Sequence, residues 1–397
     1  MATISAGSSR GERVADLSRD SLSRVLNALV QVPGMTRAEL GVRAGLTRSP
    51  VGLALAALDE RGLIEQRAEA EGGMGRPPMR IHLARDAGYS VALELGPNRV
   101  RGALFDLTGT ERHTLQAPIA DPTDASAVLD AATTVVEDAI AGAGVDRGAV
   151  FGVGVVSAGP LDAPAGLAAD VGLDDWPSLP LARALQHRVA LPVQVENDAN
   201  VGAIGEHRFG AGRGSDDLLY LRLSPTIGIG LIIRGQLYRG VSGLAGGLGH
   251  ISLGGTGPLC ECGNRGCVEA LAGSRAIVAD VHGAAHADVG TVVREAQAGD
   301  RRAQRALTDA ATIVGEGLAA AIGLLNPARV VVGGELATAG ELVMGPLAAA
   351  INRRAYPAAA NAARLVVGEL GPRAELLGAS TLHLPNLAAS LVDRLFD

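Results

Sequence analysis

The feature that most restricts the fold of this chain is a strand pattern that occurs twice after residue 86. Short apolar runs alternate there with helical patterns, which is typical of α/β proteins. A strand at 89–95 is followed by a second strand that pairs with it. A strand that begins at Leu218 leads through the glycine-rich turn 226–230 into a strand at 231–233. We therefore expect residues 87–397 to form two similar α/β lobes with a cleft between them.

Length and composition set the class of protein. The 397 residues suggest two or three domains, and 47% of them are hydrophobic, which is enough to fill large cores. Residues 1–17 are mostly small and polar, contain no apolar signal segment and are expected to be disordered. No later window approaches the ~18 unbroken apolar residues that a membrane span needs. These features predict a cytoplasmic protein with no membrane partner.

Charge is unevenly distributed along the chain. The net charge is -7, but residues 1–86 carry twelve Arg against ten acidic residues, a balance of +2. The remainder carries 23 Arg against 32 acidic residues, a balance of -9. A mildly basic segment on an acidic body permits local contact with DNA.

Three helices are predicted within residues 18–86. Apolar residues at three- and four-residue spacing indicate a helix over 21–30. Thr36 and Glu39 form a capping box that starts a second helix. After a short turn, Thr47 caps a third helix that runs to residue 61. Two helices joined by a tight glycine turn form a helix-turn-helix, so we expect 18–86 to be an all-α DNA-binding domain with a wing.

The wing is predicted from two strand patterns, 63–67 and 80–83, that can pair around the loop 68–79. A module of this kind could instead bind protein or brace the body, because the motif alone is only moderately specific. The residues expected to contact double-stranded DNA are Arg48 and Ser49 at base edges, Arg37 and Thr47 at phosphates, and Arg76 in a minor groove.

All three cysteines lie within eight positions of one another. Cys260, Cys262 and Cys267 are interspersed with glycines, and His250 is the nearest histidine in the sequence. Three thiolates and one imidazole make a closed tetrahedral Zn²⁺ site. An odd number of cysteines without a secretion signal argues against a disulfide framework. We therefore predict a structural zinc held by these four residues in a loop over 250–267.

Four motifs resemble a known family. They are Cys260–Glu269 (CECGNRGCVE), Glu196–Asn200 (ENDAN), Gly249–His250 and Gly333–Gly334. On these motifs, and from about Ser18 to the C-terminus, the chain resembles the transcriptional regulators of the ROK family, which also contains sugar kinases. The resemblance implies a two-lobed actin-like/sugar-kinase fold of duplicated RNase H-like lobes behind a winged helix-turn-helix. It also implies a structural zinc and a sugar pocket in the cleft.

The resemblance further implies which residues bind the sugar. Asn197, Asp198, His250 and Glu269 match the family's sugar-contacting positions, and Asp198 matches the general base of its kinases. Both Asn197 and Asp198 are also good helix N-caps. Glu269 and Glu206 lie on predicted helices, where a solvated carboxylate is the usual case.

Two departures from the kinase pattern argue against catalysis. The first phosphate-binding turn reads Glu94-Leu95-Gly96-Pro97-Asn98 where the kinases have Asp-x-Gly-Gly-Thr, and Pro97 removes an N–H. The second turn, 224–230, also loses glycines. We therefore expect no ATP binding and no catalytic residue.

These features predict a DNA-binding regulator, a repressor, that is a homodimer or homotetramer on a palindromic operator and responds to a sugar or sugar derivative. One alternative is an ATP-dependent sugar kinase with an added DNA-binding head. Another is a constitutive regulator with a dead pocket, because Gly247 stands where most sugar-binding members carry a Glu. Losing that hydrogen-bond partner could cost about 1–3 kcal/mol of affinity.

Overall fold

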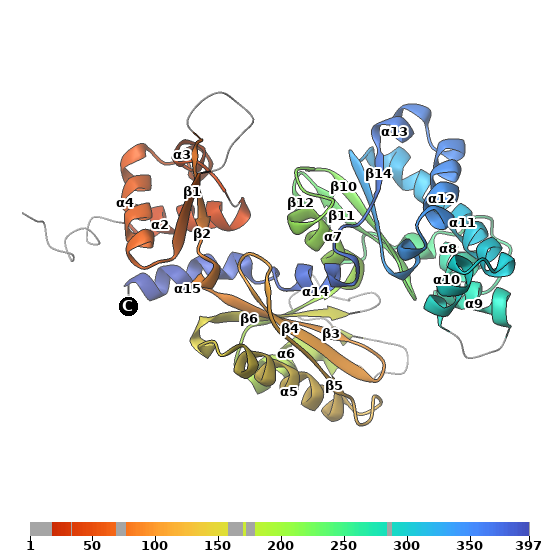
Figure 1. The fold of residues 1–397 in the computed structure, drawn as a ribbon, viewed down its shortest axis with the longest axis horizontal. Helices are drawn as coiled ribbons and strands as arrows, with labels where there is room; N and C mark the ends of the chain where they lie inside the picture. The colour runs from red at the N-terminus through yellow and green to blue at the C-terminus, as the bar shows by residue number, and fades with distance from the viewer. Residues whose placement is uncertain are drawn as a thin grey trace, which may run out of the picture.

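The computed structural model describes residues 18–32, 34–68, 77–157, 170–171, 179–283 and 288–396. Within these ranges the chain forms an N-terminal head and a body of two lobes (Figure 1). The expectations for residues 1–17 and for Arg76 fall outside the described residues.

The head is a helix-turn-helix followed by a β-hairpin. Its second helix begins with the predicted capping box: Glu39 N–H donates to the Thr36 hydroxyl, and Thr36 N–H donates to the Glu39 carboxylate. That helix ends at Gly45, whose φ of 62° lets the chain turn into the third helix. The elements are α2 (Arg19–Gln31), α3 (Arg37–Ala44), α4 (Arg48–Glu60) and the antiparallel pair β1 (Ile64–Ala68) and β2 (Met79–Leu83).

The two lobes repeat one sheet topology. Their five-stranded sheets have the orders β5-β4-β3-β6-β9 and β12-β11-β10-β13-β14. In each sheet the first three strands are antiparallel and the last three are parallel, which confirms the predicted duplication. The first-lobe strands are β3 (Tyr89–Leu95), β4 (Arg99–Asp106), β5 (Glu111–Pro118), β6 (Val150–Ser157) and β9 (Val193–Asn197). The second-lobe strands are β10 (Leu218–Leu223), β11 (Ile227–Ile233), β12 (Gln236–Leu237), β13 (Arg329–Gly333) and β14 (Arg364–Val367).

Helices cover both sheets and supply most of the apolar core. The first-lobe helices are α5 (Ala125–Ala143) and α6 (Leu181–Val189), and a short antiparallel pair is formed by β7 (Asp170–Val171) and β8 (Leu179–Pro180). The second-lobe helices are α8 (Val268–Ala272), α9 (Ser274–His282), α10 (Val289–Gln297), α11 (Arg301–Leu325), α12 (Glu341–Arg354) and α13 (Pro357–Ala362). Short 3-10 helices are η1 (Arg85–Ala87), η2 (Arg147–Ala149), η4 (Leu248–His250), η5 (Glu335–Ala339) and η6 (Gly371–Arg373).

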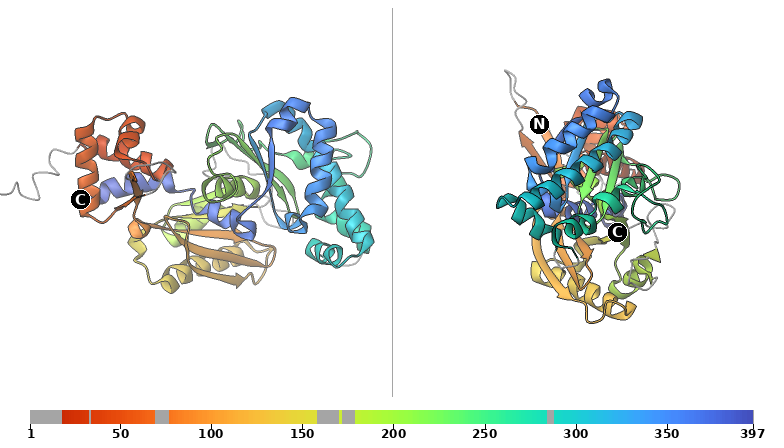
Figure 2. Two further views of the ribbon diagram at one scale, coloured as in Figure 1. Left: turned by 45° about the horizontal axis from the view of Figure 1, so that its top comes forward. Right: turned by 90° about the vertical axis from the view of Figure 1, so that its right-hand side faces the viewer.

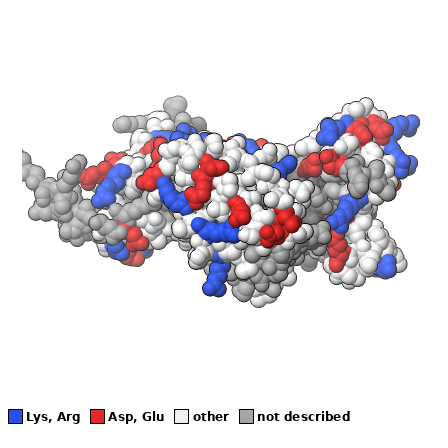
Figure 3. Space-filling view, turned by 90° about the horizontal axis from the view of Figure 1, so that it is seen from below, with Lys and Arg blue, Asp and Glu red and all other residues white. Residues whose placement is uncertain are grey.

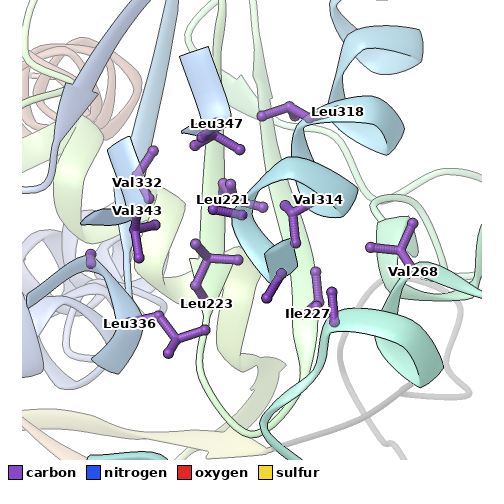
Figure 4. Close-up of a cluster of buried hydrophobic side chains, with 14 of the residues drawn as sticks. Leu221, Leu223, Ile227, Val268, Val314, Leu318, Val332, Leu336, Val343 and Leu347 are labelled. Carbon is purple, nitrogen blue, oxygen red and sulfur yellow. The ribbon is translucent and has the colours of Figure 1, made fainter. Parts of the chain in front are cut away.

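Helix α11 is central to the second lobe. Figure 4 shows Val314 and Leu318 of α11 within the cluster that also contains Leu221 and Leu223 of β10. Of the described residues, α11 alone is long and apolar enough to span a membrane. Because 56% of its apolar window is buried inside the protein, its composition is explained by its place in this core.

Two helices, α7 (Asp198–Phe209) and α14 (Ala374–Ala379), lie between the lobes. They approach at glycines: a Cβ added at Gly378 would lie 1.8 Å from the Val201 carbonyl oxygen. In the last turn of α7, the Glu206 carboxylate accepts hydrogen bonds from the N–H groups of Ala211 (2.7 Å) and Leu370 (2.9 Å). The expectation that Glu206 is solvated is therefore wrong, since its carboxylate closes the loop behind α7.

The predicted glycine-rich turn 226–230 is also wrong, because most of it belongs to strand β11. Its glycines allow α7 to pack closely on the second sheet. A Cβ added at Gly230 would lie 2.3 Å from the Ala199 carbonyl oxygen, and one added at Gly228 would touch the Ala199 side chain. The glycines thus serve helix–strand packing rather than chain reversal.

The C-terminal helix α15 (Leu384–Phe396) packs in the core of the head, although it follows the body in sequence. Its Leu387 and Leu391 are buried in one cluster with Leu22 and Leu26 of α2. Figures 1 and 2 show α15 extending from the body beneath the head helices. The head is therefore held to the body by an apolar core as well as by the chain connection after β2.

Candidate functional site

The histidine and cysteines of the predicted metal loop lie together. The Cys260 Sγ is 3.6 Å from the His250 Nδ1, and the Cys262 Sγ is 3.7 Å from the Cys267 Sγ. The donor atoms of His250, Cys260 and Cys262 all lie within 4.8 Å of one another, and this group could hold a metal ion. Cys267, the fourth predicted ligand, is not part of that group: its Sγ approaches Cys262 and lies 3.5 Å from the His250 main-chain oxygen. Tetrahedral zinc with ordinary bond lengths separates its ligand atoms by about 3.6–3.8 Å. The donor types and both distances therefore fit such an ion.

A tight turn presents these donors. The Cys260 N–H donates to the Asn264 carbonyl (2.7 Å), and the Gly263 N–H donates back to the Cys260 carbonyl (2.9 Å). Gly263 has a φ of 87°, which an L-residue rarely adopts. Because Cys260 and Cys267 are buried and Cys262 is exposed, the cluster lies at the edge of the protein rather than deep in its core.

Glu269 anchors the metal loop to the second sheet. It lies in the first turn of α8, directly after the last cysteine, and its Oε2 accepts a hydrogen bond of 2.8 Å from the Ile227 N–H at the start of β11. A Cβ added at Gly249, next to His250, would lie 3.0 Å from the same oxygen. Glu269 is thus not the solvated carboxylate that is usual on a helix.

Asn197 caps helix α7. Its Oδ1 accepts hydrogen bonds from the N–H groups of Ala199 (2.9 Å) and Asn200 (3.3 Å). Behind it, the buried Glu196 accepts from the Asn197 N–H and pairs with Arg239 at 2.6 Å. The capping expectation for Asn197 is confirmed, and it fixes the position of the following Asp198.

Asp198 belongs to a buried set of three charges. Its Oδ2 lies 2.9 Å from Arg222 Nη1, and Arg222 Nε lies 3.0 Å from Glu375 Oε1. Burial raises the pKa of the Asp198 carboxyl, and the Arg222 guanidinium opposes that rise. Burial likewise raises the pKa of Glu375. We call Asp198, Arg222 and Glu375 the charge triad.

The Asp198 carboxylate retains hydrogen-bonding capacity. Its Oδ1 accepts from the Ala199 N–H at 2.7 Å. Its Oδ2 is buried and lies 2.9 Å from the Arg222 guanidinium, and a carboxylate oxygen can accept from two donors. A buried acceptor of this kind can receive a hydroxyl group of a ligand.

The start of β11 connects the charge triad to the metal loop. Thr226 Oγ1 lies 3.4 Å from Arg222 Nη1, Ile227 binds Glu269, and the Ile229 N–H donates to the Gly246 carbonyl at 2.9 Å. The start of β11 therefore lies between Asp198 at the start of α7 and Glu269 at the start of α8, which follows the metal loop.

Residues in the two turns that were compared with the kinases' phosphate-binding turns make contacts within the protein. The Glu94 carboxylate pairs with Arg101 at 2.7 Å, and Arg101 also donates to the Pro372 carbonyl. In the second turn, Ser224 Oγ accepts from the Glu335 N–H (3.3 Å), and the Ser274 hydroxyl donates to the Ser224 carbonyl (3.0 Å). The first of these contacts is a cross-strand pair between β3 and β4, and the others join Ser224 to Glu335 and Ser274.

The predicted DNA contacts lie at the helix-turn-helix. Arg37, Thr47, Arg48 and Ser49 are exposed, and the first three line a shallow hollow between α3 and α4. On the face drawn in Figure 3, seen from below, Arg and acidic side chains are interspersed rather than gathered in one basic patch.

The charge triad was missed by sequence reasoning, apart from Asp198. Its signal was Arg222, a lone charge in the apolar strand sequence LLYLRL. Such a residue in a central strand must have buried partners, but the sequence does not identify them.

The chain is similar to both regulators and sugar kinases of one family. A profile of the ROK family matches residues 90–385. The xylose repressor of Bacillus spizizenii is 28% identical over 363 residues, which cover 90% of this chain and 93% of the repressor. The glucokinase of Streptomyces coelicolor is 31% identical over 317 residues, which cover 74% of this chain and 97% of the kinase. A crystal structure of a ROK family transcriptional regulator, a homologue of the E. coli MLC protein, covers 95% of this chain and 98% of that one, with a TM-score of 0.78 and 22% identity.

Proposed function

This chain belongs to the ROK family, and from that premise we propose that it is a sugar-responsive DNA-binding repressor. The extent of the matches supports the regulator class. The glucokinase aligns with 74% of this chain, whereas the xylose repressor aligns with 90% of it. A helix-turn-helix head is useful to a regulator and has no role in phosphoryl transfer.

The observation that carries the proposal is the contact between Arg222 and Asp198. A general base must accept a proton from the substrate hydroxyl; although burial raises the pKa of Asp198, the guanidinium 2.9 Å from its Oδ2 favours the charged carboxylate and opposes that proton transfer. Together with the changed turn sequences at 94–98 and 224–230, this contact suits the body to binding a sugar rather than to phosphorylating it.

The proposed effector is a pentose, a hexose or a derivative of one, bound near the start of α7. Asp198 Oδ2 would accept a hydroxyl hydrogen bond, with Asn197, His250 and Glu269 as further contacts. The names of the relatives, xylose repressor and glucokinase, support this class of ligand. His250 turns Nδ1 toward the cysteines, so Nε2 is the nitrogen that would meet the sugar.

We also propose that the metal loop holds zinc through His250, Cys260, Cys262 and Cys267. Zinc would supply structural cross-linking there and no chemistry, because four protein ligands leave no open position. It would fix the imidazole of His250 and the start of α8, and so the position of Glu269.

DNA recognition would use Arg48 and Ser49 at base edges and Arg37 and Thr47 at phosphates. A palindromic operator requires two heads, so we propose a homodimer or homotetramer in the cytoplasm. Its two heads must reach half-sites about 34–36 Å apart. Sugar binding between the lobes would change that spacing and hence the operator affinity.

Fluorescence anisotropy with a duplex from upstream of its own gene tests the proposal. We expect salt-sensitive, sequence-selective binding whose affinity shifts on adding D-xylose or D-glucose. Binding no tighter than to a scrambled duplex would overturn it. Turnover of either sugar with Mg-ATP in a coupled assay, abolished by Asp198→Asn, would favour the alternative of a kinase with an added head. Operator binding without any sugar effect would favour a constitutive regulator.

A further inference from the structure

Helix α7 contacts the candidate ligand site at one end and the head at the other. Its first residue is Asp198, and its 12 residues extend about 18 Å. Near its far end, Arg208 Nη2 donates a hydrogen bond of 2.9 Å to the main-chain oxygen of Val30. Val30 lies in the last turn of α2, the first helix of the head.

The Arg208 contact is strongly constrained. The guanidinium is buried, which lowers the pKa of Arg208 to about 10, and among the described residues its Nε has no hydrogen-bond partner. The Val30 oxygen is one of the carbonyls that have no partner within their own helix. A cation at this end of α2 also interacts favourably with the helix dipole. The Val30 oxygen therefore gives the buried guanidinium an acceptor, and Arg208 gives that oxygen the donor that its own helix does not supply.

Other contacts between head and body among the described residues involve the first lobe and α15. Phe151 of β6 and the apolar face of α15 belong to the head core, and His383 just before α15 donates to the Val153 carbonyl at 3.0 Å. Helix α7 packs on both sheets, through Val201 in a cluster with Phe105 of the first lobe and through Gly228 and Gly230 of the second. The bond between Arg208 and Val30 is thus a direct contact between this helix, which lies between the lobes, and the head.

We propose that Arg208 is the positioning residue that makes the head respond to the ligand site. The inference rests on the proposed function, because the ligand that would change the contacts of Asp198 is the proposed sugar effector. A change in the partners of Asp198 moves the start of α7, and a single helix transmits that displacement to Arg208. Because α2 packs against both α3 and α4, a shift at its last turn reorients the helices of the DNA-reading motif.

The test is a double-mutant cycle in the full-length chain, without sugar or DNA. Asp198→Asn perturbs the ligand end of α7, and Arg208→Gln removes the charge at the head end. Hydrogen–deuterium exchange of the last turn of α2 is the readout. We expect Asp198→Asn to speed that exchange about tenfold when Arg208 is present, the effect of weakening one charge-assisted hydrogen bond. In the Arg208→Gln background the same change should have no further effect.

Arg208→Lys, which keeps a cationic donor, should restore part of the response. An equal Asp198→Asn effect in both backgrounds, or none in either, would overturn the inference. If Asp198→Asn does not fold, Glu375→Gln perturbs the same charge triad from α14 and takes its place. The exchange measurement uses neither operator nor sugar, so its result does not depend on the anisotropy experiment. A failure of the proposed function would appear in the anisotropy experiment and not in the exchange cycle.

Discussion

Arg222 Nη1 lies 2.9 Å from Asp198 Oδ2, and the same guanidinium contacts Glu375 Oε1 at 3.0 Å through Nε. One arginine of β10 therefore joins the start of α7 to α14. Because α14 leads into the helix that packs in the head core, this buried contact links the candidate ligand site, the boundary between the lobes and the DNA-binding head.

Arg222→Met should strongly destabilise the protein. The substitution leaves two buried carboxylates without their cation, and breaking such a pair costs about 3–5 kcal/mol. Urea unfolding of the full chain measures the loss. Arg213→Met is the matched control, because its pair with Glu369 is exposed and should contribute no more than about 1 kcal/mol. Similar losses in both variants would show that the charge triad has no special role in stability.

His383 should make the stability depend on pH in the mildly acidic range. Burial lowers the pKa of its imidazole, which donates from Nε2 to the Val153 carbonyl while Nδ1 is buried without a partner among the described residues. The unfolded chain therefore binds the proton more tightly. The stabilisation is present above about pH 6.5 and is lost as the pH falls below it.

The measurement is the free energy of unfolding between about pH 7 and pH 5. His383→Gln keeps a donor for Val153 and removes the titrating group, so it should flatten the slope. His187→Gln, at an exposed histidine of α6, should retain the wild-type slope. A His383→Gln profile parallel to that of the wild type would assign the pH dependence to another group.

Local patterns predicted the fold well, because period-two and period-3.6 spacing and the Thr36 capping box depend on neighbouring residues. The charge triad was not predictable in this way. Arg222 and Glu375 are 153 positions apart, and no local pattern indicates their contact. Helix α15 was missed for a similar reason: its apolar face matches the head, which lies at the other end of the chain. The glycines of β11 were assigned to a turn because the sequence does not show the helix that packs against them.

Zinc should be present in the purified protein and should stabilise it. We expect about one Zn²⁺ per chain by atomic emission, lost on dialysis against a strong chelator together with a fall in the thermal midpoint. Cys262→Ser removes one ligand from the exposed side of the cluster and should reduce the zinc content to near zero. Full zinc content in this variant would exclude Cys262 as a ligand. Recovery of the midpoint on adding Zn²⁺ to the stripped wild type controls for damage by the chelator.

Arg48→Ala and Arg37→Ala should weaken DNA binding in different ways. Arg48 begins α4, where side chains reach base edges, so its loss should cost about 1–3 kcal/mol on the operator and relax sequence preference. Arg37, at the start of α3, should weaken binding to all sequences and lower the salt dependence. Arg305→Ala on α11 is the control, because this exposed arginine belongs to the second lobe. Anisotropy titrations at several salt concentrations separate the two effects, and equal losses on operator and scrambled DNA would contradict the role of Arg48.

Gly247→Glu should strengthen sugar binding. Gly247 precedes η4 with a φ of -68°, which any residue adopts, and a Cβ added there would meet only the Leu244 carbonyl oxygen, at 3.9 Å. The fold therefore accepts a side chain at this position. A carboxylate three residues before His250 restores the acceptor found in most sugar-binding members, and a recovered hydrogen bond is worth about 1–3 kcal/mol, or roughly fivefold to 150-fold in Kd. Calorimetry with D-xylose and D-glucose measures the gain, and Gly247→Leu controls for filling the space without an acceptor.

Gly246→Glu should unfold the loop, because Gly246 has a φ of 97° and its added Cβ would lie 1.9 Å from the Ile229 carbonyl oxygen. An unchanged affinity in folded Gly247→Glu would place the sugar away from this loop and remove His250 from its contacts.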